Sequence, residues 1–169
     1  ADFEIIDDHE GAWAVFPLTR LRPEQMAGSL VQASCLTTLD GEAHVFQRIG
    51  MFGQVTQFVE RYGDLGQDEF TSRAGTIPQR LLMMNGELIR DRTNDNIVAN
   101  AATRIATLTN KPEKQIETAY LATLTRRPTD EELQHFVVRL KDREDRNLRG
   151  AIEDLFWTLM NSTEFTWNH

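Results

Sequence analysis

The residues best suited to chemistry lie near the end of the chain, in the segment LFWTLMNSTEFTWNH. There an apolar pattern gives way to an amide, hydroxyls and a carboxylate, and the chain continues through aromatic residues to a histidine. An amide, a carboxylate and an imidazole together could bind or act on a polar ligand, and an indole could stack on a sugar ring. The candidate ligand-binding residues are Asn85, Asn161, Glu164, Trp167 and His169.

The same segment also fits a purely structural role. Asn161 stands where an amphipathic helix ends, and Glu164 follows three residues later, which is the spacing of an N-cap residue and its reciprocal partner. Phe165 and Trp167 would then fold back onto the core. We favour this capping interpretation over a ligand site.

Known catalytic and metal-binding motifs are missing from the sequence. Ser29 lies in MAGSLVQ and not in a GxSxG elbow, and neither GxxxxGKS nor GxGxxG occurs. The histidines lack HxH, HxxH or HExxH spacing, and the single cysteine, Cys35, excludes a CxxCH haem attachment and a thiolate-rich zinc site. The acidic run DDHE at residues 7–10 fits a solvated turn better than a cation site. The sequence therefore predicts no catalytic motif, no metal site and no cofactor in this chain.

Helices must position the candidate residues, because apolar residues recur at helical spacing along most of the chain. In TDEELQHFVVRLK, Thr129 and Glu132 have the spacing of a capping box. In the preceding NKPEKQIETAYLATLTRRP, Asn110 and Glu113 have the same spacing, so Asn110 is the expected cap. We expect these two helices to form an antiparallel hairpin.

Two further helices flank this hairpin. NDNIVANAATRIATL predicts a helix that packs closely through its alanines and is capped by Asn94 or Asp95. The clearest stripe in the protein predicts a long final helix and consists of Leu148, Ile152, Leu155, Phe156 and Leu159.

The first half of the chain is less regular. PEQMAGSLVQAS predicts a helix with proline in its first turn, and TIPQRLLMMNG predicts a short buried helix closed by Asn85 and Gly86. Between them, EAHVFQRIGMFGQVTQFVERYG has helical spacing, but Gly50 and Gly53 each cost about 1 kcal/mol relative to alanine and could mark a kink, a break or a close crossing. The alternation of Phe3 with Ile5 and of Trp13 with Val15 indicates two short strands.

These patterns predict an all-α fold, a single compact helical domain of about seven helices over residues 16–169, and allow a short β-hairpin near the N-terminus. A chain of 169 residues with 40% hydrophobic residues suffices for one sizeable core. Residues 1–15 are expected to be an extension or a linker from a preceding domain.

The charge and hydropathy of the chain limit its partners. The net charge is -8, and proteins that bind nucleic acid usually present a basic surface to the phosphates. The densest basic stretch, RLKDREDRNLR, is interleaved with acidic residues. No stretch approaches the roughly 20 apolar residues that span a bilayer. We therefore expect neither nucleic acid as a partner nor a membrane span.

Four blocks of the sequence carry a family resemblance. FPLTRLRPEQMAGSLVQAS, TIPQRLLMMNGELI, IETAYLATLTRRPTDEEL and DLFWTLMNSTEFTWNH occur in order from about Phe16 to the end. They resemble the C-terminal domain of unknown function, number fifteen-fifty-three, of large planctomycete cytochrome-type proteins. One departure concerns Arg22 and Pro23, which stand where many members have Ser or Thr before the helix.

Members of that family typically also carry a cytochrome-c-like haem domain and a second domain of unknown function. The resemblance therefore implies a larger, haem-linked parent protein in an extracytoplasmic or periplasmic location. Since this chain has no CxxCH, the haem would belong to another domain. The resemblance implies no known reaction.

The leading hypothesis is a non-catalytic helical accessory or interaction domain at the C-terminus of such a protein, with the other domains as its partners. One alternative is an enzyme domain acting on extracellular carbohydrate, with a site that uses Asn85, Asn161, Glu164 or His169 and is completed by missing domains. Another is a glycan-binding module that uses Trp167. Polar residues that converge on a cavity would favour the enzyme, and polar residues that cap helices would favour the accessory domain.

Overall fold

The apolar stripe near the end of the sequence forms helix α9, Asp145–Met160, at the centre of the fold. Ile152, Leu155, Phe156 and Leu159 on this helix are at most 4% exposed. Helix α9 packs against α6 (Ala101–Leu108), α7 (Pro112–Leu124) and α8 (Asp130–Leu140). The prediction of a long, one-sided final helix is confirmed.

A computed structural model describes residue 12 and residues 19–34, 45–62, 77–86, 101–141, 143 and 145–168 of the protein. Within these residues the chain forms eight helices and two strands of two residues each, and it is therefore all-α, as predicted. The remaining elements are β1 (Thr19–Arg20), α2 (Pro23–Ser34), α3 (Val45–Tyr62), α4 (Ile77–Asn85), α10 (Thr163–Thr166) and β2 (Trp167–Asn168).

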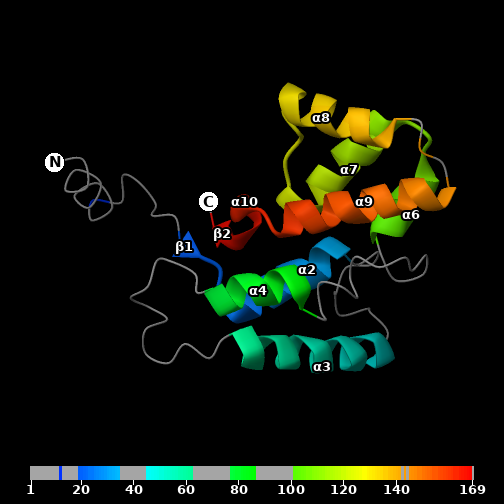
Figure 1. Ribbon diagram of the computed structural model, residues 1–169. Helices are drawn as coiled ribbons and strands as arrows, with labels where there is room; N and C mark the ends of the chain where they lie inside the picture. The colour runs from blue at the N-terminus through cyan, green and yellow to red at the C-terminus, as the bar shows by residue number, and fades with distance from the viewer. Residues whose placement is uncertain are drawn as a thin grey trace.

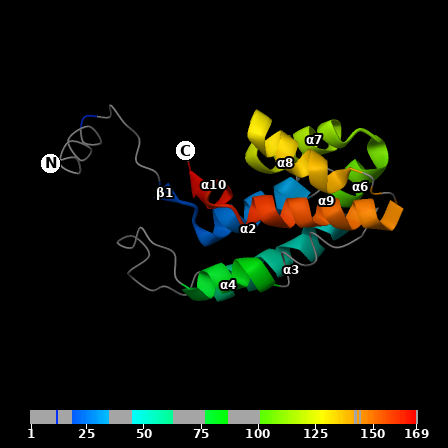
Figure 2. The same cartoon turned by 45° about the horizontal axis from the view of Figure 1, so that its top comes forward.

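The helices are arranged in layers around α2 and α9. Figure 1 shows α7 and α8 on one side of α9, with α2 and α4 on the other side and α3 outermost. The turned view in Figure 2 also places α3 and α4 on the side of α9 away from α7 and α8. Helix α2 joins the two halves because it packs on α3 as well as on α6 and α7. Its Met26 and Leu30 are fully buried between them.

The helix hairpin of the second half is also as predicted. Helices α7 and α8 pack against each other, and Figure 1 shows them running in opposite directions. Thr129 caps α8, and both hydrogen bonds of the capping box with Glu132 are present. The predicted cap of α7 is wrong, because the N-cap is Lys111, which makes no side-chain cap bond, and not Asn110. Pro112 sets this start, since proline is favoured at the first helical position.

Helix α2 begins at the proline that its sequence indicated. The backbone N–H of Arg22 donates to Oε1 of Gln25 at 2.9 Å. A side chain of the first turn therefore supplies a hydrogen-bond acceptor for the backbone N–H of the residue before the helix. Helix α3 continues through Gly50 and Gly53 without a break. A Cβ added at Gly53 would meet no atom within 4 Å, so Gly53 does not mark a close crossing.

Helix α4 ends at Asn85 and Gly86 as predicted, but it is not uniformly buried. Met83 is fully buried, whereas Leu81 is 53% exposed and Met84 is 40% exposed. Residues 81–84 are all apolar, so the sequence does not indicate which side of this helix faces the core.

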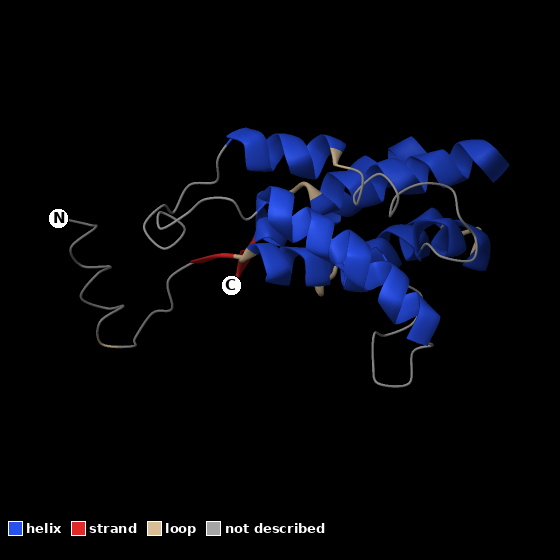
Figure 3. Cartoon of the chain, turned by 90° about the horizontal axis from the view of Figure 1, so that it is seen from below, coloured by secondary structure: helices blue, strands red, loops and turns tan. Residues whose placement is uncertain are grey.

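The two short strands join opposite ends of the described chain. Strand β1 pairs antiparallel with β2, with Thr19 opposite Asn168 and Arg20 opposite Trp167, and Figure 3 shows both strands in red beside the C-terminus. The N–H of Leu21 continues the contact by donating to the carbonyl of Thr166 at 3.0 Å. The hairpin expected from residues 3–15 lies outside the described residues, as do the expected caps Asn94 and Asp95.

Candidate functional site

The turn between α9 and α10 corrects the capping interpretation of the closing segment. The Oγ of Ser162 accepts a hydrogen bond from the N–H of Phe165 at 3.1 Å, so Ser162 is the N-cap of α10. Asn161 instead donates from Nδ2 to the carbonyl of Trp157 at 2.9 Å, at the end of α9. The predicted pair of Asn161 and Glu164 is therefore wrong. The true cap lies one residue later, because Asn161 still belongs to the turn that closes α9.

Glu164 makes an ion pair that connects α10 to the loop before α8. Arg126 donates from Nε to Oε1 of Glu164 at 2.6 Å and from Nη2 to Oε2 at 2.7 Å. This two-bond geometry fixes the carboxylate in both position and plane, which a single bond does not do. Glu164 thus has a partner that is 38 residues away in the sequence.

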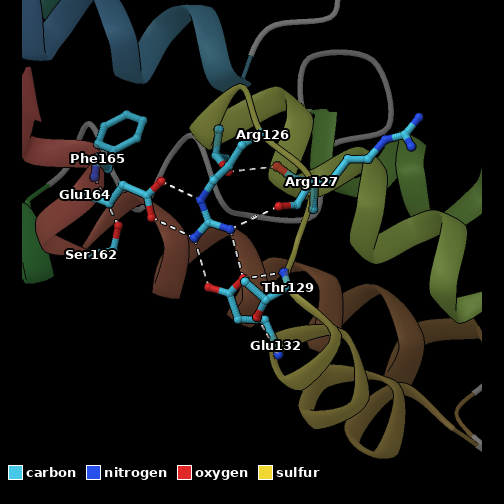
Figure 4. A network of polar contacts seen from close by, with 9 residues as sticks. Arg126, Arg127, Thr129, Glu132, Ser162, Glu164 and Phe165 are labelled. Carbon is cyan, nitrogen blue, oxygen red and sulfur yellow. Dashed lines mark hydrogen bonds and ion pairs between the residues drawn. The ribbon is translucent and has the colours of Figure 1, made fainter. Parts of the chain in front are cut away.

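The same guanidinium also holds Glu132, the capping residue of α8. Nη1 and Nη2 of Arg126 each donate to one oxygen of Glu132 at 2.9 Å, and Glu132 accepts the N–H of Thr129 at 2.7 Å. Figure 4 shows Arg126 between the two carboxylates. We call Arg126, Glu132 and Glu164 the arginine junction. It ties the starts of α8 and α10 to one side chain.

The charges of the junction shift the pKa values around it. Hydrogen bonds from Arg126 lower the pKa of Glu132 to about 2, helped by the Thr129 N–H and opposed by burial. Hydrogen bonds to Glu132 and Glu164 raise the pKa of Arg126. Burial, followed by the charge of Glu132, raises the pKa of Tyr120 to about 12, and the guanidinium of Arg126 lies 5.3 Å from this ring. Glu132 is therefore a fixed anion at neutral pH and not a proton donor.

A surface pocket of about 210 Å³ lies beside the junction. It forms where α2, the end of α7, α10 and β2 meet. Its lining combines hydroxyls, apolar side chains, one carboxylate and one indole, and consists of Leu21, Ser29, Thr123, Leu124, Thr125, Glu164, Phe165 and Trp167. We call it the Trp167 pocket. Glu164 belongs to both features, since it lines the pocket while Arg126 holds its carboxylate.

The backbone at one wall of the pocket has an unusual conformation. Thr125 ends α7 with φ 56° and ψ 14°, and it is the one non-glycine residue with positive φ in the described part of the chain. Helices often end in this left-handed conformation, but glycine usually occupies the position. A β-branched residue is strained there.

The structure brings only two of the candidate residues together. Glu164 and Trp167 line the Trp167 pocket, whereas Asn161 is used by the end of α9. Asn85 is exposed at the end of α4 and is not among the lining residues. His169 lies outside the described residues.

The sequence did not single out Arg126, which organises this region. Its local signal was the position of an arginine just before the Thr129 capping box. Its bond to Glu164 has no local signal, because only the packing of α10 near the end of α7 brings the two together.

In the described residues, no group of three or more His, Cys, Asp or Glu side chains could hold a metal ion. No helix in the described ranges has the length and the apolar character needed to cross a bilayer.

Comparisons of the chain with protein-family models, with curated proteins and with solved structures find no match. The resemblance carried by the four sequence blocks therefore stays a prediction.

Proposed function

We propose that this chain is a non-catalytic helical accessory domain at the C-terminus of a larger, exported, haem-linked protein. The observation that carries the proposal is that the polar side chains of residues 161, 162 and 164 bond to helix ends and to Arg126. Ser162 caps α10, Asn161 bonds to the end of α9, and Glu164 is held by Arg126. These side chains stabilise helix ends, which is what an accessory domain requires of them.

A surface on α4 and α9 is suited to contact with another domain of the parent protein. Leu81 and Met84 are three residues apart, so they lie on the same side of α4, and they are 53% and 40% exposed. Trp157 of α9 donates from Nε1 to the carbonyl of Met84 at 3.1 Å and is itself 36% exposed. We call these three residues the apolar patch. Tryptophan and methionine are enriched at protein interfaces.

The location in an exported, haem-linked parent rests on the sequence resemblance. Antibodies against this domain would isolate the parent from its native cells. We expect a polypeptide longer than 169 residues that shows the absorbance bands of c-type haem and is enriched in the extracytoplasmic fraction. A parent without haem, or one of this length alone, would contradict the proposal.

The accessory role is tested in the same full-length protein. Leu81→Glu places a charge in the apolar patch and should speed the release of this domain by limited proteolysis, because contact with the neighbouring domain is weakened. Val138→Glu on α8 is the matched control, since Val138 is 75% exposed and is not part of the patch. Equal release rates for the two variants would contradict a docking role for the patch.

A further inference from the structure

Among the residues that the structure describes, two hydroxyls in the Trp167 pocket lack the hydrogen bond to the helix backbone that several other hydroxyls make. Ser34, Thr118 and Thr158 donate to the carbonyl four residues earlier, at 2.7 Å in each case, which is the usual arrangement inside a helix. The side chains of Ser29 and Thr125, by contrast, make no hydrogen bond within the described part of the chain. Both hydroxyls line the pocket and can donate to and accept from a ligand.

The indole of Trp167 has the same property. It lines the pocket and is partly buried, and its N–H makes no hydrogen bond within the residues that the structure describes. The indole of Trp157, for comparison, donates to a backbone carbonyl. The Trp167 N–H is not among the buried polar atoms that lack a partner in the described residues, so it is open to solvent and is a third donor available to a ligand.

The strain at Thr125 points to the same place. Glycine would adopt φ 56° without strain, but it would not supply a hydroxyl. Residues with strained backbone are enriched at binding and catalytic sites. A threonine at this position places a hydroxyl in the pocket wall, although its backbone is strained there.

The charge of the walls selects among ligands. Glu164 lines the pocket, and the junction carries two carboxylates for one guanidinium, so its net charge is negative. An anionic ligand would be repelled. The lining offers apolar surface from Leu21 and Phe165 together with unused hydrogen-bonding groups, which suits a neutral ring that carries several hydroxyls.

We propose that the Trp167 pocket binds a neutral saccharide ring. Trp167 supplies aromatic surface and an N–H, Ser29 and Thr125 supply hydroxyls, and Arg126 positions the carboxylate of Glu164 in the wall. No bond is made or broken in this role. The inference goes beyond the proposed accessory function and does not depend on it, because either can fail without the other.

Titration of the ¹⁵N-labelled protein with methyl β-glucoside and methyl α-mannoside tests the proposal by NMR. Trp167 is one of three tryptophans, and Trp167→Phe identifies its indole resonance. A saturable shift of this resonance is expected for at least one glycoside, with a Kd on the order of 1 mM, as is usual for a small solvated ligand. Glucuronate, an anionic ring of the same size, should bind more weakly than that glycoside.

Matched variants show whether the hydroxyls take part. Ser29→Ala and Thr125→Val each remove one hydroxyl, and Thr125→Val keeps the β-branched shape. Each should weaken binding about three- to tenfold, the effect of one lost hydrogen bond. Thr163→Val is the control, since Thr163 is exposed on α10 and does not line the pocket, and it should bind as the unchanged protein does.

Three results would overturn the proposal. The first is the absence of a saturable Trp167 shift with either glycoside. The second is unchanged binding in both Ser29→Ala and Thr125→Val, and the third is tighter binding of glucuronate than of the neutral rings. A folded amide spectrum for each variant ensures that lost binding is not lost structure.

Discussion

The arginine junction and the Trp167 pocket lie side by side and share Glu164, but they use polar side chains in opposite ways. In the junction, Arg126 and Glu132 make a closed set of hydrogen bonds at 2.6–3.0 Å. In the pocket, the side chains of Ser29 and Thr125 make none within the described residues. Paired groups stabilise a fold, whereas unpaired groups in a hollow are available for binding. The difference separates the part that holds the domain together from the part that can take a ligand.

Removing the guanidinium should produce the largest effect. Arg126→Met leaves two carboxylates facing each other and should lower the free energy of unfolding by about 2 kcal/mol near neutral pH. This value is below the usual loss for a buried pair because the three side chains are 29–36% exposed. Chemical denaturation would measure it. Arg126→Lys should recover less than half, because one ammonium cannot make the same paired bonds. A loss below about 0.5 kcal/mol would show that the junction is not a stabilising element.

Acid should weaken the same junction. The pKa of Glu132 is about 2 in the folded protein against an ordinary 4.5. A lowered folded pKa means that the stabilisation is fully present above the ordinary pKa and is lost as the pH falls from about 5 towards 2. Thermal melting across this interval should show a steeper fall in Tm for the unchanged protein than for Arg126→Met. Parallel curves would contradict the role of Glu132.

Substitutions in the turn before Glu164 should lower the free energy of unfolding by less, and Ser162→Ala should lower it more than Asn161→Ala. Ser162→Ala removes the N-cap of α10 and should lower the free energy of unfolding by about 1 kcal/mol. Asn161→Ala should lower it by less. Its Nδ2 makes one bond, but its Oδ1 is buried without a partner among the described residues, so removing the amide also relieves a penalty. Urea denaturation of both variants measures the order, and the reverse order would restore Asn161 as the cap.

The smallest change in the free energy of unfolding is expected in the pocket, where the substitution should stabilise the protein. Thr125→Gly relieves the positive φ and should raise the free energy of unfolding by roughly 0.5 kcal/mol, while it removes a pocket hydroxyl. Thermal denaturation alongside the glycoside titration would show both changes. A destabilised Thr125→Gly would mean that the threonine is held for the fold and not for a ligand.

Local patterns explain what the sequence predicted correctly. The capping box of Thr129 and Glu132, the proline start of α2 and the stripe of α9 depend on residues a few positions apart, so spacing alone was enough. The two wrongly predicted caps, Asn110 and Asn161, each miss the true N-cap by one residue. At Asn161 the neighbouring Ser162 fits a cap equally well, and only the geometry of the turn decides between them. At Asn110 the start of the helix is set by Pro112, and the N-cap residue makes no side-chain bond.

Distance along the chain explains what could not be predicted. Arg126 and Glu164 are 38 positions apart, and Ser29 is farther still from all the residues that share its pocket except Leu21. Their meeting depends on how α2, α7 and α10 pack, which no spacing rule contains. The candidates Glu164 and Trp167 were therefore found by residue type, but the pocket that joins them was not.

The pairing of β1 with β2 also has a consequence for synthesis on the ribosome. Arg20 cannot find its partner until Trp167 has been made, and translation proceeds at about 5–20 residues per second. The first strand therefore waits on the order of 10 s after it leaves the exit tunnel. During that interval α10, Trp167 and the carboxylate of Glu164 do not yet exist, so the junction and the pocket are completed in the same step as the strand pair.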